Sequence, residues 1–402
     1  MKKKALSIYV HIPFCMKKCA YCDFLSAPAT EEVRAAYVDA LLREIEQEAV
    51  FYRDYSVETV FFGGGTPTVL TALQLEEILC KLKKCFGWSA KEVSLECNPG
   101  TVTKEDLYRL HKAGFNRISF GLQSAQNAEL KTLGRIHTYE MFLDAFQGAR
   151  EAEFDNINVD LMSALPGQSM ETYLDSLRKL QKLSPEHISA YSLIIEEGTP
   201  FYEQYHQADW EREREGKDKL GLLPSEEDER AMYEATKAIL EESGYERYEI
   251  SNYAKKGREC RHNLVYWTRG DYLGLGLGAS SMVDNNRWKQ TEHLQEYLCQ
   301  YGRLSGDPGV DRERQLEMTQ RERCSLSQKE QMEEFMILGL RMMSGISPEE
   351  FERTFFVSVF QIYGEVLERY QKQGLLEVSD QRIRLTDAGI DVSNVILADM
   401  ML

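Results

Sequence analysis

The sequence predicts an α/β fold: a partial (β/α)6 TIM-like barrel followed by a C-terminal, mainly helical domain with a winged-helix-like pattern. Short runs rich in β-branched and aromatic residues alternate with helical patterns over the first 200 residues. Such alternation is typical of parallel βαβ units, whose right-handed crossovers build an open sheet or a barrel. The predicted strands are 5–10, 57–62, 93–97, 118–122, 157–162 and 187–195.

Helices are expected between these strands. Thr30 is a good N-cap with acidic residues after it, and apolar residues recur at helical spacing over 33–49. Ser169 is expected to cap the helix that follows the fifth strand. Residues 204–228 are strongly charged, which indicates a solvated insertion or linker, and a further helix is expected over 226–243.

We expect three parts of the chain: a barrel over 1–205, a charged insertion with a heme-associated segment over 206–301 that completes the core, and a C-terminal domain over 302–402. The last part has a winged-helix-like pattern of helices and a two-stranded wing. Its expected helices are 332–343, 348–354, 359–373 and one from 387, with strands at 374–378 and 382–386. The acidic balance of this domain argues against DNA binding.

Composition excludes several classes of protein. The 402 residues are 43% hydrophobic, enough for a large core, and carry a net charge of −17. Nucleic-acid binding needs a basic patch, and no long Lys/Arg run is present. No stretch approaches the roughly 18 apolar residues of a membrane span, and no secretory signal pattern is seen. The chain therefore reads as cytoplasmic.

Three of the nine cysteines, Cys15, Cys19 and Cys22, lie in a loop directly after the first predicted strand. Three thiolates can ligate three irons of a 4Fe-4S cluster and leave the fourth iron open for a chelating ligand. The amino and carboxylate groups of S-adenosyl-L-methionine (SAM) suit that iron, and a reducible cluster there permits one-electron cleavage of the SAM C–S bond. The alternatives are unligated cysteines or a zinc site, for which His11 is the only nearby fourth ligand.

Polar or glycine-rich residues follow other predicted strands. Gly63–Gly65 follow the second strand, and Glu96 ends the third. Gln123 follows the fourth strand, and Asp160 lies near the end of the fifth. In parallel α/β folds the chemistry sits at the carboxyl ends of the strands, so these residues are expected at one rim with the cysteine loop.

Residues 9–24, YVHIPFCMKKCAYCDF, resemble the radical SAM superfamily and, within it, the oxygen-independent coproporphyrinogen III oxidase-like branch. The similarity extends over nearly the whole chain. The resemblance implies SAM contacts from Tyr9, Gly64, Gly65, Thr66, Glu96, Gln123, Arg135 and Asp160. Arg135 suits the methionyl carboxylate because a guanidinium can bind it bidentately. The alternative for each residue is a structural hydrogen bond or ion pair, and Arg135 is the strongest candidate for that.

The branch contains an enzyme, coproporphyrinogen III dehydrogenase, and heme carriers. The resemblance implies that the enzyme has a longer segment before its cysteines and a further cysteine two residues after the third. Here only 14 residues precede Cys15, and Phe24 stands at the position of that cysteine. Both departures weigh against oxidative decarboxylation, and whether the chain is an enzyme is left open.

The segment His262-Asn263-Leu-Val-Tyr266-Trp267 resembles the heme chaperones of the branch. A neutral imidazole of His262 can ligate iron, and Tyr266 and Trp267 offer faces for a planar macrocycle. Two alternatives stay open: His262 is a core histidine packed beside two aromatics, or the thiolate of Cys260 is the ligand.

The expected function is that of a heme chaperone, which binds heme and transfers it to acceptor proteins with the help of a 4Fe-4S cluster and SAM. The resemblance also implies a possible homodimer. The second hypothesis is a radical SAM dehydrogenase that converts propionates of coproporphyrinogen III to vinyl groups. The third is a non-catalytic zinc-binding scaffold.

Overall fold

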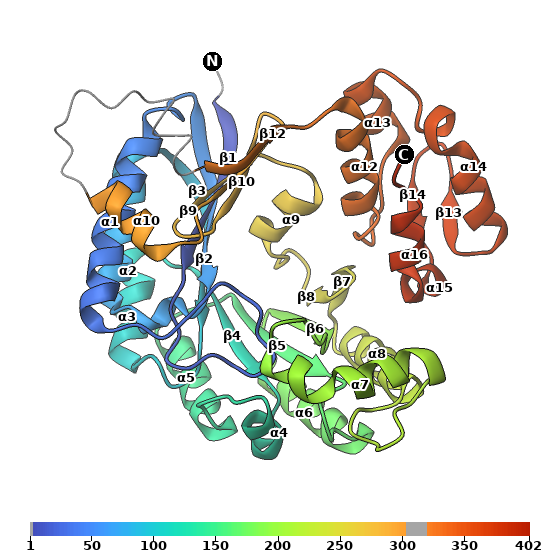
Figure 1. Cartoon of the computed structure of the whole chain (residues 1–402), viewed down its shortest axis with the longest axis horizontal. Coiled ribbons are helices and arrows are strands. Elements are labelled where there is room, and N and C mark those ends of the chain that lie inside the picture. The colour runs from blue at the N-terminus through green and yellow to red at the C-terminus, as the bar shows by residue number, and fades with distance from the viewer. Residues whose placement is uncertain (1–2, 303–319) are drawn as a thin grey trace.

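The computed structural model describes residues 3–302 and 320–402, and its centre is one twisted sheet (Figure 1). The strand order is β12-β11-β10-β9-β1-β2-β3-β4-β5-β6-β8-β7. The first six strands pair in parallel, in chain order. They are β1 (Lys4–Ile12), β2 (Tyr55–Gly64), β3 (Gly87–Cys97), β4 (Arg117–Gln123), β5 (Ile157–Ser163) and β6 (His187–Ser192). The predicted partial (β/α)6 TIM-like barrel is confirmed.

Strands from the second half of the chain form both edges of this sheet. On one side β9 (Tyr272–Leu275) pairs in parallel with β1, and three antiparallel partners follow: β10 (Ser280–Val283), β11 (Asn286–Gln290) and β12 (Gln320–Ser325). On the other side are β8 (Asn252–Ala254) and β7 (Glu246–Glu249). The sheet therefore draws strands from all three predicted parts, and the boundaries at 205 and 301 stay predictions.

Helices connect and cover the parallel strands. Thr30 accepts from the backbone N–H of Val33 as the predicted N-cap, and Ser169 forms a capping box with Thr172. None of the helices in the described part of the chain is long and apolar enough to cross a membrane. The helices of this layer are α1 (Glu31–Ala49), η1 (Pro67–Val69), α2 (Ala72–Cys85), α3 (Lys104–Ala113), α4 (Asn127–Thr132), α5 (Tyr139–Glu151), α6 (Met170–Leu183), α8 (Glu226–Glu242) and α10 (Leu294–Gly302).

The charged segment that we expected to be an insertion or linker contains a helix, α7 (Pro200–Glu215). Its apolar residues Phe201, Tyr205 and Ala208 are buried in a satellite cluster of the core. Arg212 is also buried and pairs with Asp209 at 2.7 Å. A few apolar residues on one side of a helix suffice to anchor it, however charged its other side is. The start of the segment is therefore a packed helix, and its assignment as an insertion stays a prediction.

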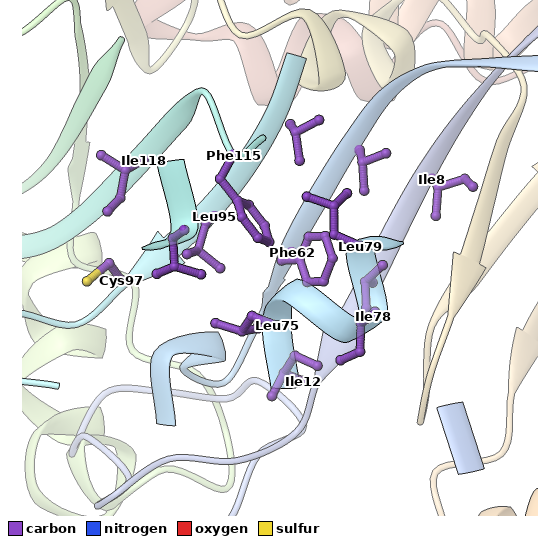
Figure 2. Close-up of a cluster of buried hydrophobic side chains, with 14 of the residues drawn as sticks. Ile8, Ile12, Phe62, Leu75, Ile78, Leu79, Leu95, Cys97, Phe115 and Ile118 are labelled. Carbon is purple, nitrogen blue, oxygen red and sulfur yellow. The ribbon is translucent and has the colours of Figure 1, made fainter. Parts of the chain in front are cut away.

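The main core lies between the parallel strands and the helices that cover them. Figure 2 shows side chains from β2 and β3, including Phe62 and Leu95, against Ile78 and Leu79 of α2. All four are fully buried. Burial of an aliphatic or aromatic side chain stabilises the fold by about 1.5–3 kcal/mol, so this layer fixes the strand ends that carry the site.

The C-terminal region has a core of its own. Its helices and two-stranded wing match the predicted winged-helix-like pattern, with β13 and β14 antiparallel. They are α12 (Gln328–Gly339), α13 (Pro348–Phe355), α14 (Val359–Lys372), β13 (Leu376–Val378), β14 (Ile383–Leu385), α15 (Asp387–Asp391) and α16 (Ser393–Ala398). Between this region and the sheet lies α9 (Arg261–Trp267), which contacts β2 and α12 (Figure 1).

A buried carboxyl group ties α1 to the edge strands. Glu44 accepts from the backbone N–H of Gly276 at 2.8 Å, from Tyr297 Oη at 2.6 Å and from Gln290 Nε2 at 2.7 Å. Burial raises the pKa of Glu44 to about 8. As the pH rises, the unfolded chain releases this proton near pH 4.5, whereas the folded state keeps it until about pH 8.

Glu44→Ala is expected to cost about 3 kcal/mol or more, because it leaves three buried donors without an acceptor. Glu44→Gln is the matched control: its amide accepts from Gly276 and Tyr297, and Gln290 Oε1, which has no partner, can accept from it after rotation. The stability that Glu44 contributes is full below pH 4.5 and is lost as pH rises through about 8. Thermal melts between pH 5 and 8 should show this slope in the wild type and a flatter one in Glu44→Gln. Equal stability of Glu44→Ala would contradict the role of the network.

Candidate functional site

The cysteine loop starts at the end of β1 and is fixed at both ends. The backbone N–H of Cys15 donates to Ala27 O at 3.2 Å, and that of Ala27 donates to Pro13 O at 3.0 Å. His11 holds the loop from inside, because its Nε2 donates to Leu25 O at 3.0 Å. Burial lowers the pKa of His11, so the ring is neutral and its Nδ1 accepts from Tyr9 Oη at 3.1 Å. The protein's own hydrogen bonds thus anchor the loop to the sheet.

All three loop cysteines line one cavity of about 130 Å³. None of the three forms a disulfide, and all three are partly exposed. Cys15 Sγ lies 3.5 Å from Thr66 Oγ1, and Cys19 Sγ accepts from Arg135 Nη1 at 3.6 Å. In the described part of the chain, no group of three or more His, Cys, Asp and Glu side chains is arranged to hold a single metal ion.

Most of the residues predicted to contact SAM lie in the same cavity. They come from the ends of different strands and from the turn before α5, as parallel strands with aligned carboxyl ends require. Lining residues from the prediction are Gly64, Gly65, Thr66, Glu96, Gln123, Arg135 and Asp160. Tyr9 instead lines a neighbouring cavity. The assignment of these residues to SAM stays a prediction, and their convergence supports it.

Gly64 and Glu96 form one wall of the cavity. The backbone N–H of Gly64 donates to Glu96 Oε2 at 3.1 Å. Gly64 has a φ of +109°, and a Cβ there would lie 2.4 Å from the ring of His11, so only glycine fits. Burial raises the pKa of Glu96 to about 8, which leaves this carboxyl protonated near neutral pH. A cationic amino group beside it would favour the carboxylate, as expected for a ligand such as SAM.

Arg135 crosses the floor of the cavity. Its guanidinium donates to Asn98 Oδ1 at 3.1 Å and to Gly121 O, and these bonds hold it in place. The Nε of Arg135 is buried and has no hydrogen-bond partner. A buried donor without an acceptor is costly, so a ligand carboxylate would fit here. Arg135 therefore makes structural hydrogen bonds, as expected if its role were structural, and its Nε is still available to donate to a ligand.

Gln123 and Asp160 complete the far wall. Gln123 has a φ of +69° at an irregularity in the β4–β5 pairing, and its Oε1 accepts from Tyr191 Oη at 3.1 Å. Asp160 Oδ1 accepts from Asn158 Nδ2 at 2.7 Å. Burial raises the pKa of Asp160, although hydrogen bonds from its neighbours oppose this shift.

Other residues that sequence reasoning did not assign to a site also line this cavity, among them Tyr21, Asn98 and Tyr191. Asn98 directly follows β3, and Tyr191 is the penultimate residue of β6. The strand-end rule that identified Glu96 and Gln123 also applies to these two. Tyr21 lies between two of the loop cysteines and carries no spacing signal of its own.

A second cavity of about 620 Å³ lies beside the first. Phe24 lines both. The cavity walls combine aromatic and basic residues with small residues and the acidic side chains of Asp23 and Glu292. Pockets of 300–1,000 Å³ are the usual size for organic ligands. The lining includes Tyr9, His11, Lys18, Tyr266, Tyr272 and Lys289.

The segment predicted to contact heme is helix α9, and its side chains point in different directions. Tyr266 lines the second cavity, whereas Trp267 lies under the Arg341 guanidinium of the C-terminal region, 4.7 Å from the ring centroid. His262 is 1% exposed, with Nδ1 2.8 Å from Thr59 Oγ1 and Nε2 2.9 Å from Tyr266 Oη.

The carboxylate of Glu92 holds the start of α9. It accepts from the backbone N–H groups of Arg261 and His262, both at 3.0 Å, and from Cys260 Sγ at 3.6 Å. Burial raises the pKa of the Cys260 thiol to about 12. The assignments of His262 or Cys260 as iron ligands stay predictions.

Comparison with known proteins agrees with this geometry. Residues 9–180 match the radical SAM superfamily, and residues 326–392 match the HemN C-terminal domain. The solved structure of coproporphyrinogen III oxidase (HemN) from Escherichia coli, described as a radical SAM enzyme, superposes with a TM-score of 0.82 at 24% identity, covering 100% of this chain and 91% of that one. That likeness supports the fold.

Curated relatives are similar over the full length. The heme chaperone HemW of Lactococcus lactis is 36% identical over 403 residues, which cover 100% of this chain and 99% of that protein. The heme chaperone HemW of Bacillus subtilis is 34% identical, covering 95% of this chain and 96% of that protein. The chain therefore belongs to the HemW family of the radical SAM superfamily.

Proposed function

We propose that this protein is a heme chaperone, which binds heme and passes it to acceptor proteins. The observation that carries the proposal is the second cavity, together with full-length similarity to curated heme chaperones. Aromatic walls suit a flat macrocycle, and the ammonium group of Lys18 and that of Lys289, which also pairs with Glu292, suit propionates. We further propose that it acts in the cytoplasm and dimerises during transfer.

Cys15, Cys19 and Cys22 would hold a 4Fe-4S cluster in the first cavity, with SAM on its open iron. Arg135 would bind the SAM carboxylate through Nε, and Glu96 would take the amino group. Asp160 and Gln123 would hold polar ends of the adenosine. When bound, this pair of cofactors supplies one-electron reductive chemistry. The protein residues would bind the cluster and SAM, orient SAM on the open iron and exclude water from the cavity.

The cluster assignment is tested by cysteine substitution. After anaerobic reconstitution, Cys15→Ala, Cys19→Ala and Cys22→Ala should each lose most of their iron and sulfide, because a thiolate ligand is removed from every one. Cys80→Ala, in the exposed cysteine of α2, is the control and should keep about four irons per chain. Iron and sulfide assays, together with zinc analysis, show whether the three loop cysteines hold the cluster. Zinc at one per chain with little iron in the wild type would favour the zinc scaffold.

The SAM assignment is tested at Arg135. Arg135→Gln should weaken SAM binding about 10- to 100-fold, because one charge-assisted hydrogen-bonded contact is lost. Equilibrium dialysis of SAM against the cluster-loaded protein measures this effect. Iron content of the variant is the control for folding. Arg109→Gln, which removes a surface ion pair to Glu76 on α2, should bind SAM as the wild type does. An unchanged SAM affinity in Arg135→Gln would contradict the assignment and show that the role of Arg135 is structural.

The proposed function is tested by offering both heme and the dehydrogenase substrate. Hemin should bind saturably, and Lys18→Gln/Lys289→Gln should bind it about tenfold or more weakly, since two charge partners of the propionates are gone. Lys217→Gln, in an exposed lysine after α7, is the control. Anaerobic incubation with SAM, reductant and coproporphyrinogen III should yield no protoporphyrinogen. Formation of that product would establish the dehydrogenase instead.

A further inference from the structure

A chain of buried hydrogen bonds runs beneath the first cavity, from β5 to β7. Asn158 Nδ2 donates to Asp160 Oδ1 at 2.7 Å, and Asn158 Oδ1 lies 2.6 Å from His187 Nδ1. An amide oxygen can only accept, so Nδ1 of His187 carries a hydrogen. The other ring nitrogen, Nε2, lies 2.9 Å from the hydroxyl of Tyr248. That hydroxyl accepts from the backbone N–H of Cys260, at the start of α9.

The amide of Asn158 uses its full hydrogen-bonding capacity. Its two hydrogens go to Asp160 and to Ser119 Oγ, the latter at 2.7 Å. Its oxygen accepts from His187 and from Ser189 Oγ, the latter at 3.2 Å. A rotated amide would set its oxygen against a carboxylate oxygen of Asp160, and both of these groups accept. Asn158 is therefore held in the orientation in which it donates to Asp160.

The chain lies behind the cavity wall and not in it. The carboxyl group of Asp160 lines the first cavity, whereas Asn158 is 2% exposed and His187 is fully buried. Asn158 and His187 are paired across β5 and β6, and Asn158 shares the inward face of β5 with Asp160, two residues on. The inner layers of a parallel barrel are usually filled by branched apolar side chains. A polar layer directly below Asp160 therefore indicates a role beyond packing.

We propose that His187 and Asn158 are positioning residues, which aim the Asp160 carboxylate at a ribose hydroxyl of SAM. They thereby set the preference of the first cavity for ribose over deoxyribose. This inference rests on the proposed function, in which Asp160 holds a polar end of the adenosine. An aspartate side chain can turn about χ1 and χ2, and the second rotation is weakly restricted. Because the protein's own hydrogen bonds order this carboxyl group, the entropic cost of binding the ligand is lower.

The test is equilibrium dialysis of SAM, and of its 2′-deoxy and 3′-deoxy analogues, against the cluster-loaded, full-length protein. Wild type should bind SAM about tenfold or more tightly than one of the analogues, since a site that bonds a hydroxyl rejects the molecule that lacks it. Asp160→Ala should lose this ratio of affinities. His187→Leu, which has no donor, should lose most of the ratio as well, with the iron content of the wild type.

His187→Asn is the matched variant, because its amide nitrogen can take the place of Nδ1 and donate to Asn158. It should keep most of the ratio of affinities. His206→Leu, in an exposed histidine of α7, is the control and should bind all three molecules as the wild type does.

Equal weakening of SAM and both analogues in His187→Leu, with the ratio unchanged, would overturn the inference and leave the chain of hydrogen bonds with a structural role. A wild type that binds SAM and both deoxy analogues alike would also overturn it, and this result needs no variant to fold. Both outcomes leave the SAM site intact. Lack of SAM binding by the cluster-loaded wild type would instead overturn the SAM assignment of the proposed function.

Discussion

The contact between the His11 ring and Gly64 is the constraint on which the site depends. In the parallel pairing of β1 and β2, His11 lies beside Gly63 and Ile12 beside Gly64, so the two strands end together. The ring occupies the space that a side chain at position 64 would need. From there His11 holds the cysteine loop through Leu25 O, while the neighbouring Gly64 presents its N–H to Glu96. One contact thus sets the wall between the two cavities.

The two cavities differ in chemistry, and this difference supports a division of work. The first contains buried acids, with the pKa of Glu96 and Asp160 raised by burial, and a buried arginine with a free donor. Such groups suit a ligand that has both an amine, for the acids, and a carboxylate, for the arginine. The second cavity is lined by aromatic residues and lysines, together with Asp23 and Glu292, and Phe24 lines both cavities. A flat, anionic macrocycle in the second cavity would lie beside the cluster without being ligated by it.

Sequence reasoning predicted the parallel strands and the rim because both follow from local patterns: alternating β-rich and helical runs, and polar residues where strands end. It could not predict the surroundings of His262. Those depend on Glu92, Thr59 and Tyr266, which meet only after β2, β3 and α9 pack together. Helix α7 was missed for a related reason, since Phe201 and Tyr205 are buried by distant Leu165 and Leu193. Charge counts along the chain do not reveal such contacts.

The most direct measurement is a crystal structure of the full-length protein loaded with cluster, SAM and hemin, with the irons located by anomalous scattering. The account predicts two separate iron sites, one enclosed by Cys15, Cys19 and Cys22, and one in the cavity lined by Tyr266 and Phe24. A heme bound elsewhere, for example on the C-terminal helices, would contradict the account, as would a cavity beside the cluster that stays empty in the loaded protein.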